Sequence, residues 1–302
     1  MSESLIITIV VLYFSLLFLV SQLTKGKSDN KTFFSGNKES PWYIVAFGMV
    51  GASLSGITFI SVPGDVGAID FTYFQVVIGY LFGYMIVAFV LLPIYYKYNL
   101  TSIYEYLGDR FGRNSHMTGA FFFFISRVLG AAFRLFLVAI VLQEFVFNSW
   151  GVPFEMTVIL SILLIWIYTF RGGIKTVVWT DTLQTFLMIL SVILSIYFIT
   201  DSLDLTFSDY LKSNDFSMQN RIFVTDSILE KNHFIKSFLG GLFITVCMTG
   251  LDQDMMQKNL TCKTLYDAQK NMVVFSFILV GVTFIFLILG ALLFTFAENN
   301  NV

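Results

Sequence analysis

Residues 48–67 read GMVGASLSGITFISVPGDVG, and Gly, Ala and Ser fill most of the first nine positions. This stretch lies in an apolar segment, from about residue 42 to 63, that is long enough to cross a bilayer. A spanning helix that faces lipid would carry Leu, Ile and Val here. Gly lowers the cost of unwinding a helix, and an unwound spanning helix exposes carbonyl oxygens that can bind a cation. We therefore expect a broken helix over residues 42–63.

The same residues allow a second interpretation. Gly48, Ala52 and Gly56 are four residues apart and so fall on one face of a helix. Small residues at this spacing let a second helix approach closely. Composition alone favours packing, whereas the rest of the sequence shifts the balance toward unwinding.

The whole chain has the composition of a membrane protein. Of its 302 residues, 56% are hydrophobic and 13% are charged, compared with about 25% charged residues in soluble domains. Apolar runs of about 20 residues alternate with short polar stretches. They predict an all-α polytopic membrane protein of one domain, with about eight transmembrane helices. The runs are 5–20, 42–63, 73–93, 117–147, 154–170, 176–200, 234–251 and 272–296.

Basic residues are distributed unevenly among the loops. Loops 24–41, 94–116, 171–175 and 252–270 together hold twelve Lys and Arg, whereas the opposite side holds four. Cytoplasmic loops carry the excess of positive charge, so the chain is expected in the inner (plasma) membrane with both ends outside. The polar stretch 201–232 then lies outside the cell and could hold a short surface helix.

Several charged residues fall within or beside the apolar runs. Arg127 and Arg134 are seven residues apart on one helix face; they face a cavity or pair with other groups, or Arg127 reaches the headgroups. Asp181 lies early in the sixth run, where it attracts a cation or serves as a helix-start anion. Residues 252–254, Asp-Gln-Asp, end the seventh run as an interfacial polar cluster or a functional one.

Motifs for other classes of protein are absent from the sequence. No Ser-His-Asp spacing, Walker loop or dinucleotide loop occurs, so we expect no enzyme activity and no organic cofactor. No basic tract suggests nucleic acid. Cys247 and Cys262 have no metal-ligand spacing and are expected to be free thiols.

Three motifs together resemble those of the sodium/solute symporter family, which includes bacterial sodium–sugar carriers and mammalian sodium–iodide and vitamin carriers. They are SGITFISVPGDVG at 55–67, GGIKTVVWTDTLQ at 172–184, and DQDMMQKNL at 252–260 followed by DAQK at 267–270. The middle motif is the most specific. With the helix spacing included, the resemblance covers nearly the whole chain.

The resemblance implies a five-plus-five inverted-repeat transporter fold. Residues 1–40 would form an extra N-terminal helix and loop, and 41–200 the first repeat. The extracytoplasmic loop 201–232 would lead into the start of the second repeat at 233–302, which stays incomplete. We therefore expect the N-terminal portion of a longer carrier. Alone, it would offer too few of the about five or six oxygen ligands that a sodium ion needs and would not couple sodium to transport.

The resemblance also implies site residues. Sodium would bind at the unwound helix, through the carbonyls of Gly51 and Leu54 and through Ser55, and hard oxygen ligands suit this ion. Asp181 matches the aspartate on the ion's exit path. The substrate-binding positions are Ser53, Thr58 and Gln75.

Three residues depart from the sugar-carrying members of the family. Thr58 stands where those members have glutamine, and Met248 and Leu279 stand where they have an aromatic gate and a lysine. Sugar is therefore not expected as the substrate. The function implied is symport of sodium and a small solute across the bilayer by alternating access. The alternatives are the input module of a membrane sensor with the same fold, or a structural membrane fragment without a site.

Overall fold

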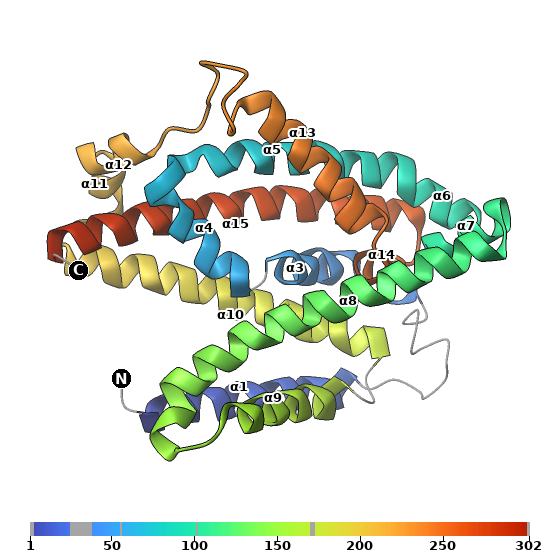
Figure 1. Cartoon of the computed structure of the whole chain (residues 1–302), viewed down its shortest axis with the longest axis horizontal. Coiled ribbons are helices and arrows are strands. Elements are labelled where there is room, and N and C mark those ends of the chain that lie inside the picture. Colours follow the sequence, from blue (N-terminus) through green and yellow to red (C-terminus); the bar gives the residue numbers. More distant parts are fainter. Residues whose placement is uncertain (1–2, 25–37, 55, 101, 170–172, 301–302) are drawn as a thin grey trace.

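The computed structural model describes residues 3–24, 38–54, 56–100, 102–169 and 173–300, and in these ranges it holds helices and loops but no strand. The longer helices are α1 Glu3–Thr24, α3 Trp42–Ser53, α4 Gly56–Ile69, α5 Tyr73–Ile86, α8 Arg113–Leu142, α9 Phe154–Thr169, α10 Gly173–Ser202, α13 Phe234–Thr245 and α15 Leu265–Asn300. Helices α1, α5, α10 and α15 lie roughly along one direction, whereas α4 and α13 run obliquely to them (Figure 1). The shorter helices are η2 Asp70–Thr72, η3 Val87–Leu91, α6 Leu92–Lys97, α7 Ile103–Phe111, η4 Gln143–Phe147, η5 Asn148–Trp150, α11 Phe207–Leu211, α12 Asn214–Gln219, η6 Val246–Gly250 and α14 Gln253–Asn259.

Apolar helices long enough to cross a bilayer make up most of the described chain. Five stretches qualify by length and composition, and the bent pair Phe234–Gly250 plus Gln253–Asn259 makes a sixth. The longest stretch, Gly56–Lys97, turns back on itself at η2 (Figure 1). Helices α3 and α9 are apolar but shorter. The number of crossings therefore stays a prediction, whereas the expected surface helix in 201–232 is present as α11 and α12.

The helix expected to be broken is broken. Helix α3 ends at Ser53, Leu54 is extended with φ −87° and ψ 102°, and α4 begins at Gly56. Ser55 lies outside the described residues. Helix α4 continues to Ile69 with Pro63 inside it, beyond the predicted end at residue 63. A helix packed among others in a membrane tolerates an internal proline because neighbouring groups satisfy the freed carbonyl.

The small residues of this segment also pack, so both sequence interpretations hold, each for different residues. A Cβ atom on Gly48 would lie 2.9 Å from Val178 O, and one on Gly51 would lie 2.2 Å from Thr185 Oγ1. These contacts seat α3 against α10. A Cβ on Gly56 would meet nothing within 4 Å, so this glycine belongs to the break.

Glycines also seat α13 against α5. A Cβ on Gly79 would lie 2.2 Å from Phe238 O, and one on Gly83 would lie 2.7 Å from Leu242 O. From the other side, a Cβ on Gly241 would lie 2.1 Å from Val76 O. The two backbones therefore approach as closely as small residues allow, which is the role that the spacing of Gly79 and Gly83 indicates.

A second break separates α13 and its π-helical end η6 from α14, with a bend of 71°. Asp252 caps α14 by accepting a hydrogen bond from Met255 N. Residues 252–254 thus begin a new helix, and the prediction that they end the preceding one is wrong. Lys258 was expected in a loop, but it lies in α14 and is buried.

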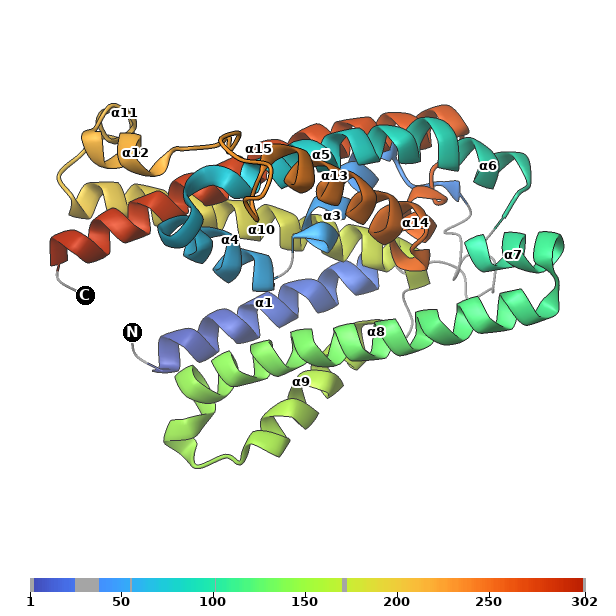
Figure 2. The same ribbon diagram turned by 45° about the horizontal axis from the view of Figure 1, so that its top comes forward.

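Helix α15 carries much of the core, whereas α1, α8 and α9 lie on the outside (Figures 1 and 2). The beginning of α1 and the end of α15 lie at the same end of the molecule. The end of α1, the start of α10, and α6, α7 and α14 lie toward the opposite end, and they flank the loops rich in Lys and Arg. This arrangement agrees with the predicted grouping of those loops.

Candidate functional site

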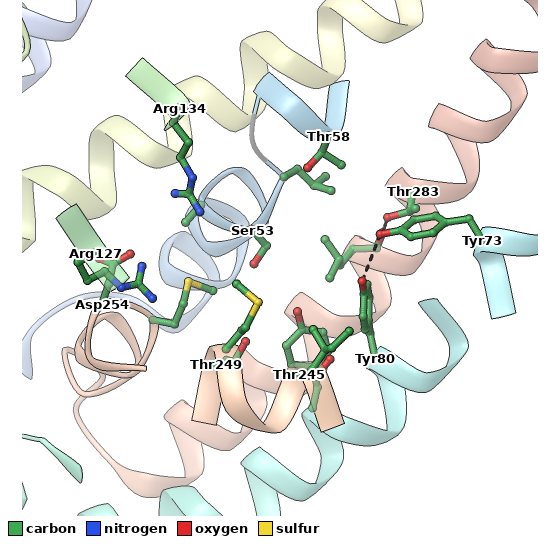
Figure 3. A pocket seen from close by; sticks show the side chains of 17 residues that line it. Ser53, Thr58, Tyr73, Tyr80, Arg127, Arg134, Thr245, Thr249, Asp254 and Thr283 are labelled. Carbon is green, nitrogen blue, oxygen red and sulfur yellow. Dashed lines mark hydrogen bonds between the residues drawn. The ribbon is translucent and has the colours of Figure 1, made fainter. Parts of the chain in front are cut away.

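A cavity of about 200 Å³ lies between the two helix breaks (Figure 3). The end of α3 and the start of α4 form one part of its wall, and η6 and α14 form another. Helices α5, α8, α13 and α15 complete it. The cavity therefore meets both points where a helix is interrupted, which are the points where backbone polar groups lose their helical partners.

Two arginines enter this cavity from α8, opposite Tyr73 and Tyr80 (Figure 3). Arg127 forms an ion pair with Asp252 at the start of α14. Arg134 lies about two helical turns further along α8, toward the first break. In the part of the chain that the structure describes, no ion pair or hydrogen bond engages the Arg134 side chain. Arg134 is thus a positive charge available to a ligand.

Hydroxyl groups cover much of the remaining wall. The Tyr73 and Tyr80 hydroxyls lie 3.2 Å apart, and Tyr84 lies beside them. The other hydroxyl-bearing residues of the wall are Ser53, Thr58, Thr245, Thr249 and Thr283. The sequence prediction missed the three tyrosines, although their spacing of seven and four residues puts them on one face of an apolar helix.

The first break places backbone charge of both signs at the cavity. The carbonyls of the last three residues of α3, Gly51 to Ser53, and that of the C-cap Leu54 come after the last carbonyl bonded at this cap, that of Val50, which accepts from Leu54 N. The first amides of α4 are likewise free of helical partners, and the helix dipole adds positive potential there. A cation suits the first set of groups and an anion suits the second.

The predicted ligand residues fall in three places. Ser53, Leu54 and Thr58 line the cavity, as do Met248 and Leu279 at the positions that differ from the sugar carriers. Gly51 lies behind it, against Thr185 of α10. Ser55 was predicted as a sodium ligand and lies outside the described residues.

Gln75 lies apart from the cavity. Its side chain is fully buried and holds the loop before α13. The amide nitrogen donates to Thr72 O and Asn232 O, and the amide oxygen accepts from Val224 N. The Gln75 amide is therefore engaged by backbone groups of the protein itself.

Asp181 also lies away from the cavity wall, on α10. Its Oδ2 atom is 2.8 Å from Lys258 Nζ. The same nitrogen is 3.7 Å from Asp254 Oδ1, and Asp254 reaches the cavity. The carboxylate predicted on the ion's exit path is therefore engaged by a lysine that the sequence prediction had left in a loop.

The model of the sodium:solute symporter family matches residues 33–301. The chain belongs to the sodium:solute symporter family. The resemblance seen in the three motifs is confirmed, and the chain is a multi-pass membrane protein.

Similar members of this family are named as sodium-coupled carriers. The chain is 26% identical to the mouse sodium-coupled monocarboxylate transporter 1 over 82% of its own length and 40% of the relative's. It is 27% identical to the sodium/sialic acid symporter NanT of Aliivibrio fischeri, over 91% of this chain and 54% of the relative. The chain thus spans about half the length of the curated relatives it matches.

A solved structure has the same fold. It is the substrate-bound, outward-open state of a Na⁺-coupled sialic acid symporter, described as having a novel Na⁺ site. The two chains share 24% identity with a TM-score of 0.83, over 96% of this chain and 61% of the other. The prediction of an all-α transporter fold is confirmed. The division of the chain into repeats stays a prediction.

Proposed function

We propose that this chain binds a small carboxylate and sodium as part of a carrier that moves the two together across the membrane. The observation that carries the proposal is Arg134, a positive charge without a protein partner among the described residues, in a cavity beside a broken helix. A carboxylate is the anion that an Arg guanidinium binds with matched geometry. The amides at the start of α4 add a second attraction for the same charge.

The hydroxyls of the cavity suit the rest of such a solute. Ser53 and Thr58 flank the break, and Tyr80 faces them from α5 (Figure 3). They can bond a hydroxyl or keto oxygen next to the carboxylate. A volume of about 200 Å³ suits a small solute. The names of the similar proteins, monocarboxylate and sialic acid carriers, agree with an acidic solute.

Sodium is proposed to bind at the carbonyls of Gly51 and Leu54. The end of α3 supports this assignment because its carbonyls lack helical partners and oxygen ligands suit a hard cation. Ser53 can add a hydroxyl ligand. Sodium and carboxylate would then bind on either side of one break, so each ion lowers the electrostatic cost of binding the other.

The orientation proposed is an outside N-terminus in the inner membrane, with α14 toward the cytoplasm. The excess of Lys and Arg at the α6, α7 and α14 end supports it (Figure 1). A single cysteine in place of Ser213, on the loop that carries α12, should react with an impermeant maleimide from outside. Labelling from the cytoplasmic side alone would show that the orientation is the opposite of the one proposed.

Transport itself is tested in liposomes that contain the protein as it is made in the cell. We expect an inward sodium gradient to drive uptake of labelled lactate or sialic acid, and a potassium gradient not to. Lactamide, the neutral analogue of lactate, should not compete. Equal uptake with sodium and potassium would refute sodium coupling.

The role of Arg134 is tested with Arg134→Gln and Arg134→Lys. The loss of a charged hydrogen bond of about 1.5–3 kcal/mol should weaken carboxylate binding about 10- to 150-fold in Arg134→Gln. Arg134→Lys keeps the charge and should retain part of the affinity. If Arg134→Gln binds lactate as tightly as the natural protein, the carboxylate assignment is wrong.

A further inference from the structure

Lys258 is a lysine in the interior of the molecule. Its side chain is 5% exposed, and Lys is almost never this buried without a partner. Its partners are Asp181 on α10, with Nζ 2.8 Å from Oδ2, and the more exposed Asp254 one turn back on α14, at 3.7 Å. The strong contact is therefore the one that crosses from α14 to α10.

This contact places two cations in competition for one carboxylate. A sodium ion that reaches Asp181 needs the carboxylate oxygens as ligands. The Lys258 ammonium carries the same charge and already lies against one of those oxygens. Both cannot be held closely at the same oxygens without repulsion in a buried site. Binding of sodium at Asp181 therefore requires Lys258 to move.

Displacement of the Lys258 ammonium from Asp181 removes an ion pair that ties α14 to α10. Helix α14 has only seven residues and follows the 71° bend at the second break. Its other end is fixed to α8 by the ion pair between Asp252 and Arg127. With both ion pairs present, α14 is fixed to α8 at one end and to α10 at the other. Loss of the Lys258 contact removes the ion pair to α10 and leaves the ion pair to α8 and the hydrogen bond that Asn259 accepts from Asn271 of α15.

We propose that Lys258 is an internal cation that occupies Asp181 and holds α14 against α10 until a sodium ion replaces it. The inference rests on the proposed function, because it supplies a step by which sodium passage opens one end of the carrier. It assigns Lys258 as a positioning residue that acts through Asp181 and α14. In the absence of sodium, the pair keeps that end closed.

The test measures binding of ²²Na⁺ to the purified protein at pH 8, together with its melting temperature. The Lys258→Met variant removes the competing charge and should bind sodium at least fivefold more tightly, within the range of typical coupling between sites. The Lys258→Arg variant keeps a cation and should bind sodium as the natural protein does. The double variant Asp181→Asn/Lys258→Met should lose the gain.

The double variant also guards against misfolding, since it leaves no lone charge in the buried site. Hydrogen exchange of residues 252–259 gives a second readout. We expect faster exchange in Lys258→Met and, on addition of sodium, in the natural protein. A merely structural pair would lower the melting temperature of Lys258→Met without tightening sodium binding.

The possible outcomes separate this inference from the proposed function. If the natural protein binds sodium and Lys258→Met binds it no more tightly, the inference is overturned and sodium coupling stands. If the gain persists in the double variant, Asp181 is not the shared ligand and the inference is also overturned. A natural protein that neither binds sodium nor responds to it in uptake refutes both proposals.

Discussion

The two helix breaks differ in what satisfies them. At the break between α3 and α4, Leu54 is extended, and Ser53, Leu54 and Thr58 line a cavity. At the break between α13 and α14, Asp252 caps the new helix and pairs with Arg127. The Tyr95 hydroxyl also donates to Gly250 O there. The first break is open to ligands, whereas the second is satisfied by the protein's own side chains.

The two breaks are therefore suited to different roles, the first to ligand binding and the second to movement. Backbone groups left without partners favour binding of ions, because the ions supply the missing partners. A break held by ion pairs has two arrangements, paired and unpaired, and can act as a moving part. We therefore expect changes at the first break to alter binding, and changes at the second to alter stability and motion.

The largest expected effect is on the contact between α5 and α13, the helix that leads to the second break. A Cβ at Gly241 would lie 2.1 Å from Val76 O, a backbone atom, whereas at Gly240 it would meet nothing within 4 Å. Gly241→Ala should destabilise the protein by about 1–3 kcal/mol through overpacking, and lower its melting temperature by several degrees. Gly240→Ala should leave it unchanged or higher. Equal melting temperatures would show that α13 is not held by this contact.

A change at the contact between α3 and α10, beside the first break, should alter sodium binding more than it alters stability. A Cβ at Gly51 would lie 2.2 Å from Thr185 Oγ1, a side-chain atom that can rotate, so Gly51→Ala should cost about 1 kcal/mol. The shift of α3 would move the two proposed sodium ligands, Gly51 and Leu54, and we expect sodium affinity to fall about fivefold. Gly56→Ala, with open space around it, is the control. Equal sodium affinity in both variants would argue against the Gly51 carbonyl as a ligand.

The ion pair that anchors α14 on α8 is tested by Asp252→Asn. Asn caps a helix as well as Asp does, so this variant removes the charge of the pair while keeping the cap. Since Arg127 is 35% exposed, solvent screens the pair and the cost should be about 1 kcal/mol or less. Asp254→Asn, at a side chain 48% exposed, should cost less still. Chemical unfolding of both variants measures the difference, and a larger cost for Asp254→Asn would contradict it.

The smallest effect is chemical and concerns the loop after α14. Cys262 is fully buried, and burial raises the pKa of its thiol to about 12, with the Asp267 carboxylate adding to the rise. At pH 8 about one thiol in ten thousand is then ionised. In a Cys247→Ser background, alkylation should be slow and should rise about tenfold per pH unit below 12. Fast alkylation at pH 7 would mean that this loop is open.

The first break and the helix packing could be predicted from sequence because each depends on local residue types. The density of Gly and Ser before residue 57 predicted the break, and the spacing of Gly79 and Gly83 predicted the contact with another helix. The position of Asp181 early in its helix was also evident. These features need no knowledge of distant partners.

The charged contacts could not be predicted in the same way. Arg127 meets Asp252 and Asp181 meets Lys258 across more than 70 residues of chain. The burial of Lys258 depends on the bend at the second break, which carries no dense cluster of small residues to signal it. Gln75, predicted to bind substrate, is likewise used by a distant loop.

Hydrogen exchange around the first break tests the central claim most directly. Amide exchange is compared in sodium and in potassium, with lactate present, for peptides covering residues 48–60 and 246–256. The account predicts that sodium slows exchange in 48–60, where an ion completes the missing backbone partners, and does not slow it in 246–256. Slower exchange in 246–256 alone, or no difference between sodium and potassium in 48–60, would contradict it.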